Sequence, residues 1–303
     1  PMHTRAFLID YPPHRYVGAD MATHRHLVSL GGTTTVFTPG AARRYTLDGV
    51  LVLPWNLEDP DLEHLDEPAD VFVTLPYGSA PLRRAISCFE ATVKVLMAHS
   101  ATDWTRACFH DMADGFDVWA ANSRATAEAL QITGDPRTLV VHPELHPVFR
   151  DRARELQPTN GSVPTVMLVN PIGPKGVHIY RALMVQRPDW NYLVVAGGYG
   201  RSASTDLVAT ASRHRARLEL IAEQVPPERM ADLYQRADVL VQPSLHESYG
   251  QVALEARTVG TPVVATDLPG VREALGPFRD GVEYLPPPPD AMALEEAVRR
   301  LTG

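Results

Sequence analysis

The chain has 303 residues, of which 45% are hydrophobic and 21% charged, as in an ordinary globular protein long enough for two domains. Its net charge of -8 argues against nucleic acid as a partner and gives no support for binding to anionic membranes. We find no apolar run of about eighteen residues, so no membrane span is expected. The two cysteines, Cys88 and Cys108, are too few for a disulfide framework, and the N-terminal sequence PMHTRAFLID predicts a strand rather than a signal peptide. These features favour a reduced, cytoplasmic protein.

The first half of the chain alternates predicted strands and helices. The strands are mostly apolar runs without alternation, which is typical of a parallel sheet covered on both faces. We expect strands at Arg5–Asp10, Thr34–Thr38, Gly49–Leu53, Asp70–Leu75, Val93–Ala98, Phe116–Ala120 and Thr138–His142. We expect helices at Asp20–Ser29, Pro81–Glu90, Asp103–Met112 and Ser123–Gln131. The segment Glu144–Pro164 then loses periodicity and carries Pro, Asn, Gly and Ser, so we interpret it as an interdomain linker.

The second half repeats this architecture without repeating the sequence. Strands are expected at Thr165–Val169, Tyr192–Ala196, Arg217–Ile221, Asp238–Gln242, Pro262–Thr266 and Val282–Leu285. Helices are expected at Lys175–Gln186, Ser204–Arg213, Pro227–Arg236, Gly250–Val259 and Asp290–Leu301. Short βα units in series imply right-handed crossovers and a doubly wound sheet. We therefore predict an α/β protein with two Rossmann-like domains, residues 1–150 and 151–303, which face each other across a cleft.

Two glutamates, Glu247 and Glu255, are the most informative residues of the second half. Glu247 follows the predicted strand Asp238–Gln242, and Glu255 lies in the helix after it. Ligands of an open α/β sheet bind beyond the carboxyl ends of its strands, where free backbone N–H groups near Tyr249, Gly250 and Gln251 would face an anion. A carboxylate beside an anion site must meet hydroxyl groups, because like charges repel. The arrangement therefore indicates a ligand with both sugar and phosphate, such as a nucleotide-sugar.

The segment that contains both glutamates resembles the E-x7-E block of GT-B-fold retaining glycosyltransferases of the family 4 type. The matching residues are Pro243-Ser244, Glu247, Tyr249-Gly250, Glu255-Ala256, Gly260-Thr261-Pro262-Val263-Val264-Ala265 and Gly270-Val271-Arg272-Glu273. The resemblance implies the GT-B fold, with a nucleotide-sugar in the second domain and the acceptor beside the first. It also implies that Glu247 holds sugar hydroxyl groups and that Glu255 holds the ribose.

The rest of the implied donor site follows neighbouring strands. In the family, an arginine and a lysine after the first strand of this domain grip the donor diphosphate. The lysine matches Lys175, whereas Asn170 occupies the expected place of the arginine and brings no charge. Arg201 is a candidate to compensate. It follows the run Gly197-Gly198-Tyr199-Gly200, where Gly198 would let the backbone approach the nucleotide.

Candidate residues of the first domain are assigned by the same resemblance and by position. Gly18 matches one glycine of a Gly-Gly loop that approaches the donor phosphate, and His99 matches a histidine beside the transferred sugar. A simple strand-end histidine is the competing interpretation of His99. By position alone, we expect the acceptor side to include Asp103, Trp104 and Arg106. No metal site is expected, since His24 and His26 point apart on a helix.

The sequence therefore predicts a metal-independent retaining glycosyltransferase without a cofactor. It would move a sugar from a nucleoside diphosphate sugar, with UDP and GDP both open, to a small-molecule acceptor in bacterial specialised metabolism. Lys175, Glu247 and His99 would be its catalytic residues. Two alternatives stay open: a sugar-nucleotide epimerase of GT-B fold, and a non-catalytic nucleotide-sugar binding protein.

Overall fold

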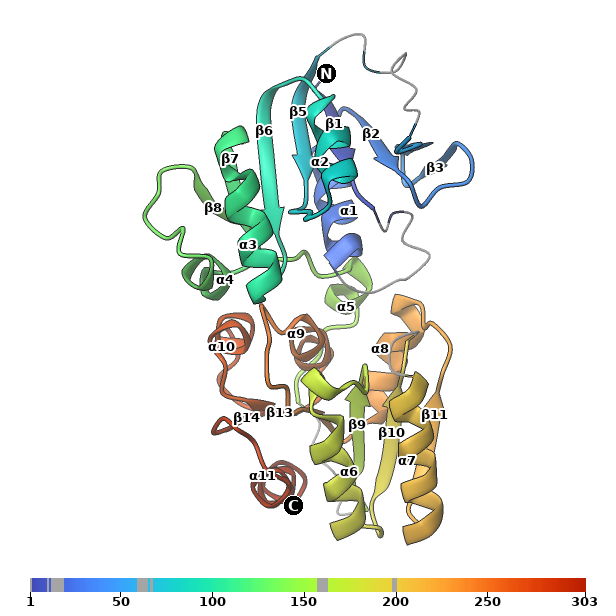
Figure 1. The fold of residues 1–303 in the computed structure, drawn as a ribbon. Helices are drawn as coiled ribbons and strands as arrows, with labels where there is room; N and C mark the ends of the chain where they lie inside the picture. The colour runs from blue at the N-terminus through green and yellow to red at the C-terminus, as the bar shows by residue number, and fades with distance from the viewer. Residues whose placement is uncertain are drawn as a thin grey trace. The chain divides into compact units, whose positions relative to one another are not determined.

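The computed structural model describes residues 2–9, 11, 19–58, 65, 68–156, 163–197 and 201–303, without the side chains of residues 19–22, 201 and 202. The chain forms two compact units, Pro1–Glu144 and Leu145–Gly303 (Figure 1). They divide after Glu144, whereas the sequence placed the boundary after residue 150. Each unit is built on one largely parallel sheet, so the prediction of two Rossmann-like α/β domains is confirmed.

The first unit contains an eight-stranded sheet in the order β3-β4-β2-β1-β5-β6-β7-β8. Every neighbouring pair is parallel except β3 with β4. The strands are β1 His3–Phe7, β2 Thr33–Thr38, β3 Tyr45–Leu47, β4 Val50–Pro54, β5 Ala69–Thr74, β6 Ala91–Ala98, β7 Val118–Ala121 and β8 Thr138–Val140. The helices are α1 Ala19–Ser29, α2 Ala80–Ser87, α3 Asp103–Met112 and α4 Arg124–Ala129, with a 3-10 turn, η2, at Ala113–Gly115.

The second unit contains a six-stranded parallel sheet in the order β11-β10-β9-β12-β13-β14. This is the order of a dinucleotide-binding sheet, whose direction of growth reverses between β9 and β12. The strands are β9 Thr165–Val169, β10 Asn191–Val195, β11 Arg217–Ile221, β12 Val239–Gln242, β13 Val263–Thr266 and β14 Val282–Leu285. The helices are α5 Pro147–Asp151, α6 Val177–Gln186, α7 Arg201–His214, α8 Pro227–Arg236, α9 Gln251–Thr258, α10 Pro269–Leu275 and α11 Ala291–Thr302, with a 3-10 turn, η3, at Gly173–Lys175.

The predicted elements are present, and their boundaries differ by at most three residues, as at the end of β1 (predicted at Asp10, found at Phe7). The sequence prediction missed β3, which pairs antiparallel with β4 across Asp48 and Gly49. Both turn residues have positive φ, 49° and 83°, as a two-residue hairpin of this hand requires. The prediction of a linker without secondary structure at Glu144–Pro164 was wrong for Pro147–Asp151, which form the helix α5. The α5 residue Phe149 is buried beside Tyr234 in the second unit.

The core of the second unit lies on both faces of its sheet. Successive residues of β9 point to opposite faces. Val166 and Leu168 therefore pack under α6, α7 and α11, while Met167 and Val169 pack under α8 and α9. All four residues are buried, which explains why the strand reads as a continuous apolar run.

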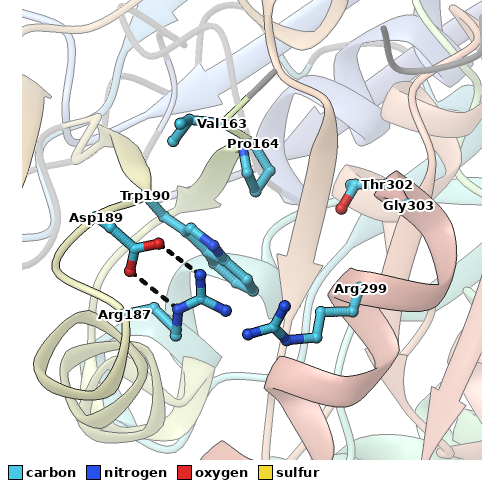
Figure 2. Close-up of a pocket in the computed structure, with 8 residues that line it drawn as sticks. All are labelled: Val163, Pro164, Arg187, Asp189, Trp190, Arg299, Thr302 and Gly303. Atoms are coloured by element: carbon cyan, nitrogen blue, oxygen red, sulfur yellow. Dashed lines mark hydrogen bonds and ion pairs between the residues drawn. The ribbon is translucent and has the colours of Figure 1, made fainter. Parts of the chain in front are cut away.

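A cavity of about 300 Å³ lies at the amino ends of β9 and β10, the opposite edge of the sheet from the loops that follow these strands (Figure 2). Its lining residues are Val163, Pro164, Arg187, Asp189, Trp190, Arg299, Thr302 and Gly303. The Arg187 guanidinium lies 4.4 Å from the centre of the buried Trp190 ring. Arg187 donates to Asp189 at 2.9 Å and to Glu295 of α11 at 3.1 Å. This ion-pair network connects the turn before β10 to the last helix.

We predict that Arg187→Ala destabilises the second unit more than Arg299→Ala. Arg187 is 17% exposed and joins two carboxylates, whereas Arg299 is 56% exposed and, among the described residues, forms an ion pair with one carboxylate, Glu295. Arg187→Ala removes a mostly buried charge together with its contact to the Trp190 ring, and it leaves Asp189 without this ion pair, so it should lower the free energy of unfolding by about 2 kcal/mol. Arg299→Ala should cost less than about 1 kcal/mol. Urea denaturation of both variants measures the difference, and equal losses would contradict this assignment.

Candidate functional site

The carboxyl ends of β9 and β12 form the place where a ligand of this fold would bind. The two strands are neighbours in the sheet but are not consecutive in the chain. The chain leaves β9 toward α6, which packs on one face, and leaves β12 toward α9, which packs on the other. In open α/β sheets, a crevice between two such loops is where ligands bind, so we expect the ligand at this edge.

The loop after β9 is shaped by residues with left-handed backbone. Asn170 has φ 55°, and its carbonyl oxygen accepts from the Ile172 N–H at 2.8 Å. Gly176, with φ 77°, ends η3 and begins α6. A Cβ atom on Gly176 would lie 2.0 Å from the carbonyl oxygen of Pro243, so only glycine fits at this position.

The loop after β12 packs backbone to backbone on its neighbours. The Leu245 N–H donates to the Pro174 carbonyl oxygen at 2.8 Å, which joins this loop to η3. A Cβ atom on Gly270 would lie 2.4 Å from the Ser248 carbonyl oxygen, so α10 also requires glycine at its contact with the loop. These close approaches fix the backbone on both sides of Glu247.

Lys175 and Glu247, predicted as catalytic residues, are brought together by these loops. Lys175 Nζ lies 2.6 Å from Glu247 Oε1. The same oxygen accepts from Gln242 Nε2 at 2.6 Å and from Ser244 Oγ at 2.9 Å. The Glu247 side chain is only 8% exposed, and that of Lys175 is partly exposed. The pair thus places an ammonium group at the crevice and holds the carboxylate by one oxygen.

The predicted anion site lies at the start of α9. Gly250, with φ 88°, is the N-cap, and because it has no side chain it leaves the first N–H groups of the helix uncapped from that position. Tyr249 precedes it and is buried. Burial, followed by the charge of Glu273, raises the pKa of Tyr249 above its ordinary value. Gln251 is the first helical residue, one position after the predicted start at Gly250.

Glu255 lies in the second turn of α9 and is buried against α8. Its Oε2 atom accepts from the Tyr234 hydroxyl group at 3.0 Å. Burial, and then the charge of Glu255, hold the pKa of Tyr234 well above its ordinary value, so the hydroxyl group stays a donor. Glu255 is therefore an ionisable group oriented by a fixed phenol.

Asn170 cannot supply the positive charge of the family arginine. Its backbone conformation, with φ 55°, instead explains why an asparagine stands at this position. Asparagine is one of the few residues other than glycine that adopt the left-handed conformation readily. Its Oδ1 atom lies 3.3 Å from where a Cβ atom of Gly197 would stand, so the side chain covers the turn after β10. Of the other predicted donor residues, Gly18 and Gly198 lie outside the described residues, and so does the side chain of Arg201, which begins α7.

His99 follows β6 in the first unit and is partly buried. Its Nε2 atom lies 2.7 Å from the Thr23 hydroxyl oxygen of α1, and its carbonyl oxygen accepts from Asn122 Nδ2 at 2.9 Å. Burial, and then the charge of His26, lower the pKa of His99 to about 4. His99 is therefore a neutral imidazole at physiological pH.

The predicted acceptor-side residues occupy the first two turns of α3, which Thr102 caps. Arg106 donates to Asp103 at 2.7 Å on the exposed side of the helix. Trp104 is 61% exposed, and a Cβ atom on Gly78 would lie 3.3 Å from its ring. These three residues and His99 lie at the carboxyl end of the same strand, β6.

Gln242 and Ser244 are site residues that the sequence prediction did not assign. Ser244 belongs to the quoted Pro-Ser pair, but nothing local shows that it contacts Glu247. Gln242 gave a weak signal, because it is a polar residue at the end of the buried run Val239–Gln242. In the described part of the chain, no three His, Cys, Asp or Glu side chains gather as metal ligands would, and no helix is long and apolar enough to cross a membrane.

Comparison with known proteins agrees with this geometry. A family model described as "Glycosyl transferases group 1" matches residues 152–302, nearly the whole second unit. The D-inositol 3-phosphate glycosyltransferase of Corynebacterium glutamicum (strain R) is 30% identical over 201 residues, which cover 58% of this chain and 47% of the relative. The enzyme of that name from Mycobacterium sp. (strain KMS) is 36% identical over 189 residues, which cover 56% of this chain and 40% of the relative. The chain thus spans less than half of these relatives.

Solved structures share the fold over the whole chain. Sucrose-phosphate synthase from Thermosynechococcus elongatus has a TM-score of 0.78 at 18% identity, covering 99% of this chain and 90% of its own. Anabaena Alr3699/HepE, solved in complex with UDP and glucose, has a TM-score of 0.72 at 17% identity, covering 99% of this chain and 89% of its own. The strand order, the paired lysine and glutamate and these likenesses lead to one assignment: the chain has the GT-B fold, and its residues 152–302 match the family of group 1 glycosyl transferases.

Proposed function

We propose that this protein is a retaining, metal-independent glycosyltransferase that uses a nucleoside diphosphate sugar. The observation that carries this proposal is the Lys175–Glu247 pair at the switch point of a group 1 domain. The pair offers a cation for phosphate and a carboxylate for hydroxyl groups within one crevice. A nucleotide-sugar needs both, because its diphosphate and its sugar are directly bonded.

The difficult step is departure of the diphosphate from the anomeric carbon, during which negative charge grows on the phosphate oxygens. The Lys175 ammonium group and the first N–H groups of α9 would stabilise that charge, and preorganised donors of this kind contribute about 3–4 kcal/mol each. Glu247 would accept from sugar hydroxyl groups. A leaving diphosphate and an oxocarbenium-like sugar would let the acceptor attack on the same face, which retains the anomeric configuration.

The remaining residues are assigned roles around this step. Glu255 would accept from the ribose hydroxyl groups, and His99 would meet the transferred sugar as a neutral imidazole. Asp103, Trp104 and Arg106 would belong to the acceptor side. The names of the relatives favour a small polar acceptor. Because Alr3699/HepE was solved with UDP, UDP is the first nucleotide to test. Bacterial specialised metabolism in the cytoplasm remains our proposed setting.

A thermal-shift screen with UDP, GDP, ADP and dTDP tests the donor class, because a specific ligand raises the unfolding temperature by mass action. The matching nucleotide-sugar is then incubated with and without inositol phosphates and other small polyols. Transfer that needs an acceptor supports the proposal. Epimerised donor without acceptor would identify an epimerase, and binding without any turnover would identify a binding protein.

Lys175→Ala should lower kcat by about 100- to 1,000-fold, because it removes the charge that stabilises the departing diphosphate. Lys175→Arg should recover only part of the rate, since the planar guanidinium differs in geometry from an ammonium group. The other lysine of the chain, Lys94 of β6, provides the control, and Lys94→Ala should leave kcat unchanged. A Lys175→Ala variant that changes only the KM for the acceptor would contradict this role.

Glu255→Gln should weaken donor binding about tenfold, because a neutral amide is a poorer acceptor than a carboxylate. A 2′-deoxyribose donor should bind the wild type about tenfold more weakly but should affect the variant little. Calorimetric titration of both proteins with both donors measures the coupling. Glu296→Gln, on the exposed side of α11, is the control. If the deoxy donor loses the same affinity in both proteins, Glu255 does not bind the ribose.

The lowered pKa of His99 predicts a dependence of stability on pH. The folded protein binds the His99 proton only near pH 4, whereas an unfolded chain binds it near pH 6.5. The unfolded state therefore holds more protons between these values, and stability should fall as the pH is lowered from 6.5 to 4. His99→Gln should reduce this fall in the unfolding temperature. His110→Gln, at an exposed position of α3, should not. Identical pH profiles for His99→Gln and wild type would show that folding does not lower the pKa of His99.

A further inference from the structure

Gln242 is the last residue of β12 and is only 5% exposed. Its Nε2 atom donates to Glu247 Oε1 at 2.6 Å. The side-chain amide oxygen of Gln242, Oε1, is buried and has no hydrogen-bond partner among the described residues. A buried acceptor without a partner costs about 1–3 kcal/mol, and an apolar side chain, as elsewhere in β12, would avoid this cost. Packing alone therefore does not explain why a glutamine occupies position 242.

The orientation of the amide follows from the charge of Glu247. A flipped amide would place its carbonyl oxygen against a carboxylate oxygen, where two acceptors repel each other. The N–H end must therefore face Glu247. Ser244 and Lys175 donate to the same oxygen, so all three donors hold Oε1. Within the described residues, no group donates to Oε2, which leaves that oxygen for a ligand.

The three donors are not equivalent when a diphosphate binds. The phosphate oxygens compete with Glu247 for Lys175, which is the partly exposed member of the pair. Gln242 and Ser244 belong to the end of β12 and have no charge that a phosphate would attract strongly. Among the described donors to Oε1, these two can keep Glu247 oriented while Lys175 serves the leaving group.

We propose that Gln242 is a positioning residue that acts through Glu247 to set the affinity for the sugar part of the donor. The proposal rests on the nucleotide-sugar function proposed above and deepens it. Gln242 would contribute to binding of the sugar hydroxyl groups and not to binding of the nucleoside diphosphate. A purely structural role would instead weaken both.

Calorimetric titration with UDP and UDP-glucose, and with GDP and GDP-mannose, separates these roles. Gln242→Met keeps the length of the side chain and removes the donor. We expect the gain in affinity from adding the sugar to fall about tenfold, which equals the loss of one hydrogen bond to a charged group. The Kd for the nucleoside diphosphate alone should change less than about twofold. Gln235→Met is the matched control, because the Gln235 side-chain amide donates to the Arg152 carbonyl oxygen and forms no described hydrogen bond to Glu247.

Gln242→Glu adds a test with the opposite sign. At high pH the new carboxylate repels Glu247, and the gain from the sugar should be lost. As the pH falls, the side chain at position 242 takes up a proton and becomes a donor, so sugar binding by this variant should improve. The wild type should show no such improvement. Equal loss of nucleotide and nucleotide-sugar affinity in both variants would overturn the proposal.

A ligand-free measurement keeps the two proposals distinct. In protein labelled with carbon-13 glutamate, the carboxyl signal of Glu247 is assigned by its loss in Glu247→Gln. Its chemical shift at a fixed pH should change in Gln242→Met, because one donor to the carboxylate is gone. An unchanged shift overturns the role of Gln242. If the shift changes but the wild type binds neither nucleotide pair, the positioning contact stands and the proposed donor class fails.

Discussion

Lys175 and Glu247 meet because β9 and β12 are adjacent strands whose chains leave toward opposite faces of the sheet. Any loop at that edge is exposed to the crevice that the reversal creates. The ion pair uses this geometry, because one partner comes from each side. The Glu247 carboxylate is largely shielded from water, so removing Lys175 would leave it with neutral donors only among the described residues. The topology of the sheet is thus the first condition for the site.

The glycines around the pair are a second condition. Gly176 and Gly270 let two segments of backbone approach the loop that carries Glu247, where any side chain would collide with a carbonyl oxygen. Several residues of the sequence block are therefore packing residues rather than ligand contacts. Asn170 belongs to the same group, since its left-handed backbone accounts for its identity without a ligand. This separates the chemistry of the block, which rests on Lys175 and Glu247, from the backbone that holds it.

Periodicity and composition predicted the α/β class and nearly all strands, because buried parallel strands read as apolar runs. The family block located Glu247 and Lys175 at one sheet edge. Contacts between residues that are far apart in the chain could not be predicted from the sequence. His99 bonds Thr23, and Glu247 bonds Lys175, across more than seventy positions of chain. The helix at Pro147–Asp151 is too short for periodicity to show, and β3, which the Asp48-Gly49 turn joins to β4, has only three residues. Gln242 looked like the polar end of a strand, because its partner lies in the following loop.

The shared oxygen of Glu247 has a consequence for which molecules can enter the crevice. A ligand that draws Lys175 away must bring an anion of its own, or the ammonium group loses its partner without replacement. Free hexoses and polyols have no such anion, so for them Lys175 stays on Oε1 and only Oε2 of Glu247 is open to their hydroxyl groups. Discrimination against the abundant neutral sugars of a cell would therefore follow from an ion pair that exists before any substrate arrives.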